Sequence, residues 1–208
     1  MIIKINPQHI QDKDLNLIKD YLEAGKVCIL PTDTCYIMAA NALDESAIKK
    51  VFAIKKRSLD KPIHVNVPSL KLAEKWVKII PLAQKLADRF LPGPLTLVLP
   101  KKEPISDLLT AGKKTLGIRL PNHPLSLALA KILAIPYTTT SANISESDPA
   151  YSIDEVLKQL DKDKIDLIVD AGRLPNRPVS TILDLTVSPP QILREGGIGT
   201  KEIQPYLL

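Results

Sequence analysis

Lysine and arginine residues gather in one short segment that could carry phosphate chemistry. Lys55 and Arg57 lie two residues apart at the end of an apolar, helix-like stretch, and the basic run continues to Lys61. On a helix the two side chains diverge, whereas in an extended segment they point the same way. Two cations that converge in a cleft suit a polyphosphate. Cations at a helix C-terminus also complement the helix dipole, so a purely structural role is the alternative.

Hydroxyl groups are concentrated in two segments that follow apolar runs. The first is Pro-Thr-Asp-Thr-Cys-Tyr at 31–36, and the second is Tyr-Thr-Thr-Thr-Ser-Ala-Asn at 137–143. Ligands of open α/β sheets bind at the carboxyl ends of strands, which favours a binding role for the first segment. A polar turn in which Asp33 and its neighbouring threonines satisfy local backbone groups is the alternative. The second segment needs a polar ligand, water or capping for its donors and acceptors.

Arginine also occurs at the end of a predicted strand. Thr115, Gly117 and Arg119 share one face of that strand, because side chains alternate. An arginine at the rim of a cleft holds a carboxylate or phosphate through two parallel hydrogen bonds, although a surface arginine is the commoner case. Ser180 and Arg194 are polar groups at two further predicted strands, and each is a weak signal by itself.

Several well-known catalytic patterns do not occur in the sequence. There is no Walker-type glycine loop, no HExxH, no nucleophile elbow and no EF-hand loop. His9, His64 and His123 are not spaced as metal ligands, so we expect surface or packed histidines and predict no metal site. Cys28 and Cys35 have neither disulfide nor zinc spacing, which fits a reducing compartment.

The composition is that of an ordinary soluble protein with a basic surplus. Hydrophobic residues make up 45% of the 208 residues and charged residues 25%, with a net charge of +5. This length predicts one domain over residues 1–208. The charge favours anionic partners such as nucleotides or RNA. The sequence has no signal-peptide pattern and no apolar run of 18 residues, so we expect a cytoplasmic protein without membrane association.

Apolar runs and helical patterns alternate along the chain. Strands are predicted at 27–30, 63–67, 95–99, 116–120, 165–169 and 182–185, with a short strand from 137 and another from 192. Helices are predicted at 12–24, 45–56, 69–78, 81–91, 124–134 and 152–160. Several connections have no helix, so the fold class is α/β with a single domain, a twisted mixed parallel and antiparallel sheet and flanking helices.

Taken in order, these segments resemble the YrdC-type family of threonylcarbamoyl-AMP synthases. The matching motifs are PTDTCYIMAANA (31–42), KKRSLDKPI (55–63), PGPLTLVL (92–99), IRLPNHP (118–124), SAN (141–143), STILDL (180–185) and ILREGGI (192–198). Seven motifs in the right order are far more specific than any one of them. The resemblance spans nearly the whole chain, which looks like the short, single-domain form.

The resemblance implies a reaction of L-threonine, bicarbonate or CO2 and ATP that yields threonylcarbamoyl-AMP and pyrophosphate. A separate threonylcarbamoyl transferase complex would then modify the tRNA adenosine next to the anticodon. Magnesium is expected with ATP, with Asp33 as an outer-shell partner. The implied site has Lys55 and Arg57 as catalytic residues, ATP contacts at Arg57, Lys61, Thr115, Ser141, Asn143 and Arg194, and threonine contacts at Thr34, Arg119, Thr139 and Ser180.

The sequence departs from the family pattern around this site. Two glycines of the family are replaced by Ile37 and Ala39, which predicts a stiffer loop and a smaller pocket. Lys61 stands where the family has asparagine, and Asn66 stands where it has a strand histidine.

Two alternatives to this enzyme follow from the same segments. KTLGIR (114–119) and LREG (193–196) also resemble the YciO branch, so a non-catalytic protein that binds tRNA or double-stranded RNA is the main alternative. Aromatic residues make up only 4% of the chain and do not interleave with basic ones, which favours the enzyme. A hydrogenase-maturation domain is the third interpretation, but the zinc-finger and acylphosphatase segments of such proteins are absent here.

Overall fold

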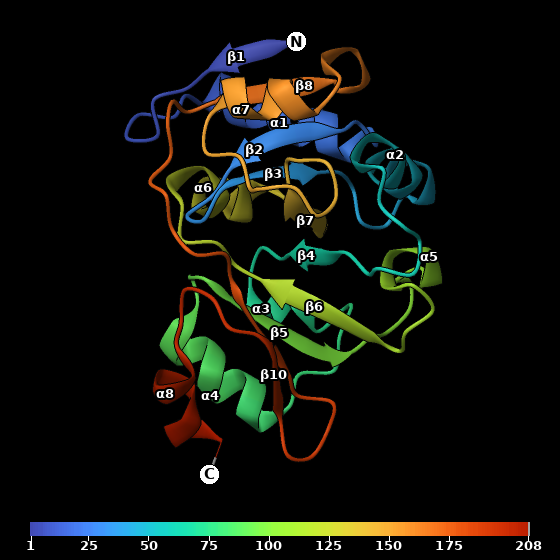
Figure 1. The fold of residues 1–208 in the computed structure, drawn as a ribbon, viewed down its shortest axis with the longest axis vertical. Coiled ribbons are helices and arrows are strands. Elements are labelled where there is room, and N and C mark those ends of the chain that lie inside the picture. Colours follow the sequence, from blue (N-terminus) through green and yellow to red (C-terminus); the bar gives the residue numbers. More distant parts are fainter. Residues whose placement is uncertain (208) are drawn as a thin grey trace.

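A ten-stranded sheet runs through the computed structural model, which describes residues 1–207. Figure 1 shows the sheet descending from the N-terminal strand to the C-terminal hairpin. The strand order is β1-β8-β2-β3-β7-β4-β6-β5-β9-β10. The strands are β1 (Ile2–Lys4), β2 (Cys28–Pro31), β3 (Tyr36–Ala39), β4 (His64–Asn66), β5 (Leu95–Pro100), β6 (Thr115–Arg119), β7 (Tyr137–Ser141), β8 (Leu167–Asp170), β9 (Thr181–Asp184) and β10 (Gln191–Arg194).

Parallel and antiparallel pairs are mixed in this sheet, as the helix-free connections predicted. The pairs β1–β8, β2–β8, β4–β6 and β5–β9 are parallel. The pairs β2–β3, β3–β7, β4–β7, β5–β6 and β9–β10 are antiparallel. The antiparallel strand β7 therefore joins the two halves of the sheet at its centre.

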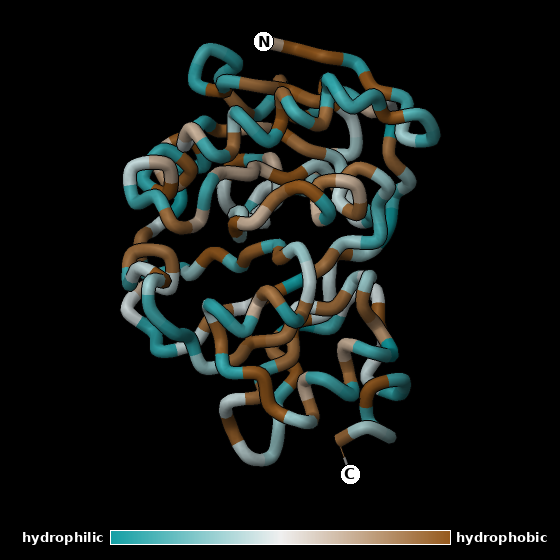
Figure 2. The backbone as a smooth tube through the Cα atoms, turned by 180° about the vertical axis from the view of Figure 1, so that it is seen from behind, coloured by the Kyte–Doolittle hydropathy of each residue, from teal (hydrophilic) through white to brown (hydrophobic). Residues whose placement is uncertain are grey.

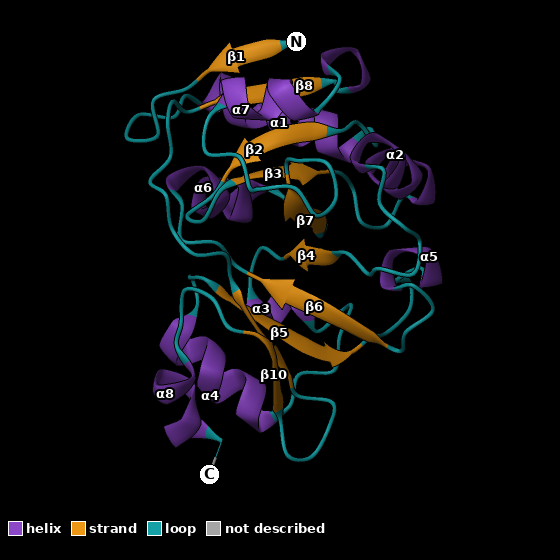
Figure 3. Ribbon diagram, viewed as in Figure 1, coloured by secondary structure: helices purple, strands orange, loops and turns teal. Residues whose placement is uncertain are grey.

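Helices lie on both faces of the sheet (Figure 3). The long ones begin where the sequence supplies a start signal. Asp44 accepts hydrogen bonds from the backbone N–H groups of Ser46 and Ala47, and Pro81 and Pro124 occupy first-turn positions. The helices are α1 (Asp12–Glu23), α2 (Glu45–Lys55), α3 (Leu70–Ala73), α4 (Pro81–Phe90), α5 (Asp107–Thr110), α6 (Pro124–Ile132), α7 (Ile153–Gln159) and α8 (Thr200–Ile203), with 3-10 turns at Lys162–Lys164 and Gln204–Tyr206.

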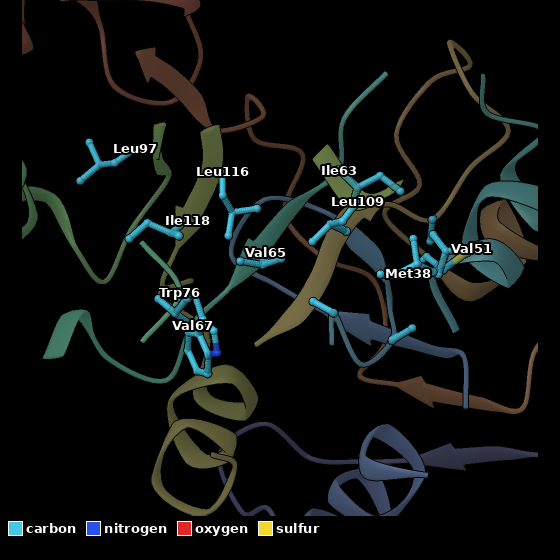
Figure 4. Close-up of a cluster of buried hydrophobic side chains, with 14 of the residues drawn as sticks. Met38, Val51, Ile63, Val65, Val67, Trp76, Leu97, Leu109, Leu116 and Ile118 are labelled. Carbon is cyan, nitrogen blue, oxygen red and sulfur yellow. The ribbon is translucent and has the colours of Figure 1, made fainter. Parts of the chain in front are cut away.

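Two hydrophobic cores form because the sheet is covered on both faces. Tyr36 and Met38 of β3 belong to the larger core, while Ile37 and Ala39 of the same strand belong to the smaller one. This alternation follows from the two-residue period of a strand. Figure 4 shows part of the larger core, and Figure 2 shows hydrophobic segments along the inner strands and hydrophilic ones at the outer turns.

In the lower half of the sheet one face of the strands is apolar, whereas the opposite face is mixed. Val65 of β4, Leu97 of β5 and Ile118 of β6 pack in the larger core (Figure 4). Several of the residues that alternate with them are polar or lack a side chain, and they include His64, Thr96 and Gly117, although Val98 of β5 is apolar. The face opposite the larger core is therefore where this sheet presents polar groups.

Some predicted elements differ from the structure. Residues 36–39, which we expected to be a loop, form the buried strand β3 between β2 and β7. The helix predicted at 69–78 ends at Ala73, because the N–H of Lys78 and the carbonyl of Trp76 pair with the end of β5 and the residues after it. The short strand β1 has too few residues for a periodic pattern. Among residues 1–207, no helix is long and apolar enough to cross a membrane.

Candidate active site

A cavity of about 200 Å³ lies on the polar face of the sheet, where the two halves meet. It is called the main cavity below. Its lining comes from eight separate parts of the chain, so only the folded sheet assembles it. The lining residues are Thr34, Cys35, Ile37, Arg57, Pro62, Ile63, His64, Thr96, Arg119, Thr139, Thr140, Ser141, Val179, Ser180, Ile182 and Arg194.

Three arginines from distant segments line the main cavity. Arg57 follows α2, Arg119 ends β6 and Arg194 ends β10. Burial lowers the pKa of Arg57 and of Arg194, and the charge of Arg119 lowers that of Arg194 further. The lining contains no aspartate or glutamate. The main cavity is therefore strongly positive and suits an anionic ligand.

The turn after α2 decides where Lys55 and Arg57 point. Lys55 is the last residue of the helix, and Lys56 has a left-handed backbone with φ of 50°. That residue reverses the chain, so Arg57 leaves the helix and reaches the main cavity. Its Nε donates to the carbonyl of Lys61 at 3.0 Å and its Nη2 to that of Pro62 at 2.9 Å. These bonds hold the guanidinium while leaving its other N–H groups for a ligand.

Lys55 is turned away from the main cavity and holds a loop. Lys55 as a whole residue is 1% exposed. Its ammonium donates to the carbonyl of Ser141, to the carbonyl of Asn143 at 2.8 Å and to Oδ1 of Asn143 at 2.9 Å. Burial and the nearby Arg57 lower its pKa to about 7. Lys55 does not line the main cavity, so its position does not match direct contact with a polyphosphate.

The loop that Lys55 holds carries Ser141 to the main cavity. The hydroxyl of Ser141 donates to Oδ1 of Asn143 at 2.7 Å, and the Asn143 amide donates to the carbonyls of Ser147 and Asp148. Asn143 is buried and does not line the main cavity. Its side chain forms hydrogen bonds with backbone carbonyls of its own loop. This is the capping role that the sequence left open as an alternative to ligand binding.

Arg119 is fixed by a buried ion pair. Its Nη2 lies 2.5 Å from Oδ1 of Asp33, its Nη1 donates to the Thr34 hydroxyl at 3.1 Å and its Nε donates to the carbonyl of Gly93 at 3.0 Å. Both charged side chains are about 5% exposed or less. Asp33 therefore orients Arg119 across the sheet. The sequence had suggested two other roles for Asp33, local capping of its turn and an outer-shell contact to magnesium. Two N–H groups of the guanidinium stay available to a ligand.

Ser180 and Arg194 form a second fixed pair. The Arg194 guanidinium donates twice to the carbonyl of Ser180, at 3.1 and 2.8 Å, and once to its hydroxyl at 3.2 Å. The Ser180 hydroxyl also lies 3.1 Å from that of Thr96 on the neighbouring strand. Ser180, just before β9, and Thr96 of β5 thus hold Arg194 in place, while Arg194 lines the main cavity.

A second, smaller cavity of about 80 Å³ adjoins the main one. The two share Pro62, Ile63 and His64 as lining residues. Thr115 lines only this small cavity, together with Asp184. The small cavity continues the site along β6, toward the start of that strand.

The structure brings together most of the residues predicted for the site. Those on the main cavity are Thr34, Arg57, Arg119, Thr139, Ser141, Ser180 and Arg194. Thr115 lies on the small cavity, whereas Lys55 and Asn143 lie behind the loop. Lys61 is 44% exposed at its side chain and pairs with Glu146 outside both cavities. The roles of all these residues remain predictions.

Sequence reasoning missed some of the lining. His64, which we expected to be a surface or packed histidine, lines both cavities, and Thr96 lies beside Ser180. The two-residue period of β4 and β5 could have found them, because both alternate with core residues. Asn66, two residues after His64, is fully buried and lines neither cavity.

Comparisons with known proteins agree on one group of relatives. The Sua5/YciO/YrdC family model, described as "Telomere recombination", matches residues 20–196. A threonylcarbamoyl-AMP synthase of Pyrococcus abyssi is 38% identical, over 100% of this chain and 61% of that protein. The structure of P. abyssi Sua5 complexed with L-threonine has a TM-score of 0.93 and 37% identity, over 99% of this chain and 60% of that one. The structure of E. coli YciO has a TM-score of 0.86 and 26% identity, over 99% of this chain and 98% of that one.

Proposed function

This chain belongs to the Sua5/YciO/YrdC family, and from that premise we propose that it acts as a threonylcarbamoyl-AMP synthase. It spans 61% of the length of the P. abyssi synthase it matches, and the shared part contains the whole cavity described above. The substrates are L-threonine, bicarbonate or CO2, and ATP. The observation that carries the proposal is the convergence of Arg57, Arg119 and Arg194 on one cavity without a lining carboxylate.

The reaction needs two anions to meet in this cavity. The threonine amine first adds to CO2 and loses a proton, or reacts with bicarbonate with loss of water, and an oxygen of the resulting carbamate then attacks the α-phosphorus of ATP. The new bond joins that oxygen to phosphorus, while the bond to the pyrophosphate oxygen breaks and pyrophosphate leaves. A phosphoryl centre of this kind asks the protein mainly for alignment and charge neutralisation.

Arg119 is suited to the carboxylate of threonine. The ion pair with Asp33 and the bond to Gly93 fix the plane of its guanidinium. Hydroxyls of Thr34, Thr139 and Ser180 line the same cavity and can fix the other polar groups of the amino acid. The P. abyssi structure was solved with L-threonine, which supports an amino-acid subsite in this fold.

Arg57 and Arg194 are suited to the phosphates. Each is held by backbone carbonyls, so its position is set before a ligand arrives and little reorganisation is needed. Ser141 and Thr115 extend this half of the site toward the small cavity. Lys55 acts through the loop of Ser141 as a positioning residue. Lys61 and Asn143 line neither cavity, so nucleotide contacts at these two residues rest on the family pattern alone.

Magnesium would enter with ATP. Among residues 1–207 no group of three or more His, Cys, Asp or Glu side chains is placed to hold a metal ion. Mg²⁺ commonly keeps several waters and binds through substrate phosphates, which fits a cavity lined by arginines and hydroxyls. The product would be consumed by a separate transferase complex that acts on tRNA.

Pyrophosphate release tests the proposed reaction. The protein is incubated with ATP, Mg²⁺ and bicarbonate, with threonine, with serine or without an amino acid, and the adenylate product is identified by mass spectrometry. We expect release to depend on threonine and to yield threonylcarbamoyl-AMP. Release that is the same without an amino acid would sink the proposal.

An arginine substitution links that activity to the cavity. Arg57→Ala should lower kcat/KM on the order of 100-fold, since loss of one such contact costs about 2–4 kcal/mol of transition-state stabilisation. Arg173→Ala is the matched control, because Arg173 is exposed and pairs with Glu155 away from the cavity. Equal activities of the two variants would show that the main cavity is not the site.

A further inference from the structure

His64 stands at the boundary between the main cavity and the small cavity. It is the first residue of β4 and lines both cavities, together with Pro62 and Ile63 just before it. Thr115 lies on one side of this boundary, and Arg57 and Arg194 lie on the other. A ligand that reaches from the arginines to Thr115 must therefore pass the imidazole ring.

The ring of His64 packs against Gly117, where no side chain is in its way. Gly117 faces His64 across the parallel pair of β4 and β6, one residue from the registered pair of Val65 and Ile118. A Cβ atom built on Gly117 would lie only 2.1 Å from Nδ1 of His64 and 2.7 Å from its Cγ. The ring therefore lies against the bare backbone of β6, and even a methyl group at Gly117 would displace it.

The surroundings of His64 keep the ring neutral. Arg194 of β10, Arg57 after α2 and Lys113 before β6 are the cations that act on it, and Asp184 of β9 lines the small cavity as well. Burial, followed by these three cations, lowers its pKa to about 4. A neutral imidazole offers one donor and one acceptor, and its Nε2, the ring nitrogen farther from Gly117, is left for a ligand.

We infer that His64 is a nucleotide-contacting residue, hydrogen-bonding ATP where the nucleotide passes from the main cavity into the small one. The inference rests on the proposed function, because it takes ATP as the ligand of the arginines. His64 adds a neutral contact beside two cations, and Gly117 positions it.

Histidine titration by NMR on the unmodified protein tests this contact. The Cε1–H signals of His64, His123 and His9 are followed against pH in the free protein, with threonine, and with α,β-methylene-ATP and Mg²⁺. Phosphates that neutralise Arg57 and Arg194 favour the charged ring, so the nucleotide analogue should raise the pKa of His64 by about one unit or more. Threonine alone should leave it within a few tenths of a unit, and His9 should not respond.

The outcomes of the titration separate the two proposals. If the analogue binds by calorimetry and shifts other signals but leaves the titration of His64 unchanged, the contact is wrong and the proposed function stands. If the analogue does not bind at all, the proposed function is wrong, and the contact is wrong with it. A shift caused by threonine alone would place His64 in the amino-acid subsite and overturn the inference.

Two substitutions supply an independent measurement. His64→Val removes the donor and acceptor, and Gly117→Ala displaces the ring without changing its chemistry. Each should raise the KM for ATP by roughly three- to tenfold, the range for one neutral hydrogen bond, with the KM for threonine within about twofold. His123→Asn is the matched control, with an unchanged KM for ATP. Equal increases in both KM values would show a merely structural role for His64.

Discussion

The ammonium of Lys55 lies 2.8 Å from the carbonyl oxygen of Asn143, a residue 88 positions further along the chain. The bond ties the end of α2 to the loop after β7, and with it the Ser141 hydroxyl to the wall of the main cavity. The two sequence motifs that contain Lys55 and Asn143 are therefore one structural unit. Lys55 contributes to the site by holding this loop.

Lys55→Met is expected to loosen the loop and destabilise the protein. Methionine fills the volume but leaves buried oxygens of Ser141 and Asn143 without their donor, which costs about 1–3 kcal/mol. Urea unfolding should show this loss, and the KM for ATP should rise with it. Lys26→Met serves as control, since Lys26 is exposed and pairs only with Asp166. A variant as stable as the original chain would contradict the role of Lys55 as a clamp.

Arg119→Lys is expected to weaken threonine binding selectively. A lysine cannot reproduce the planar fork that contacts Asp33, Thr34 and Gly93 at once. We expect the KM for threonine to rise by about tenfold or more and the KM for ATP to change little. Steady-state kinetics with each substrate varied in turn would measure this. A rise in the KM for ATP alone would place Arg119 in the nucleotide half of the site.

Lys56→Gly is expected to stabilise the protein. Lys56 ends α2 with φ of 50°, a left-handed conformation that glycine adopts without a steric penalty. The gain should be about 0.5–1 kcal/mol, since the added freedom of the unfolded chain offsets part of the relief. Chemical denaturation would measure it. Lys49→Gly, in the middle of the same helix, should instead lose about 1 kcal/mol, and a gain from both substitutions would disprove the argument from the backbone.

His123→Asn is expected to reduce the acid sensitivity of the fold. Burial lowers the pKa of His123 from 6.5 to about 4, and its Nδ1 accepts the hydrogen bond from Leu125 that caps α6. Between pH 6.5 and 4 the unfolded state binds the proton and the folded state does not, so stability falls as the pH falls through this window.

Asparagine keeps the cap without titrating, so the variant should lose less stability than the original chain between pH 6.5 and 4. His64, whose pKa is also lowered to about 4, and carboxyl groups with lowered pKa values such as Asp44 should account for acid sensitivity that remains. Thermal unfolding at several pH values measures the difference. Parallel curves for the two proteins would show that His123 is already charged in the folded state.

Fold class could be predicted because it depends on local sequence patterns, whereas most candidate site residues were inferred from the family resemblance. The period of β6 placed Thr115 and Arg119 on one face, and Asp44 and Pro124 marked the starts of two helices. The strand at 36–39 was missed because all four of its residues are buried on a two-sided sheet, where no polar alternation remains to be read.

The sequence by itself determined which residue types are available for phosphate and carboxylate binding, and the order in which they occur. Only the tertiary structure decided which of them face the cavity. It turned Lys55 inward under a loop, paired Asp33 with Arg119 across 86 positions and brought His64 against Gly117. Such contacts depend on backbone reversals and strand order, which no local periodicity encodes. The buried environments that shift the pKa values of Lys55 and His64 exist only once those distant segments have packed together.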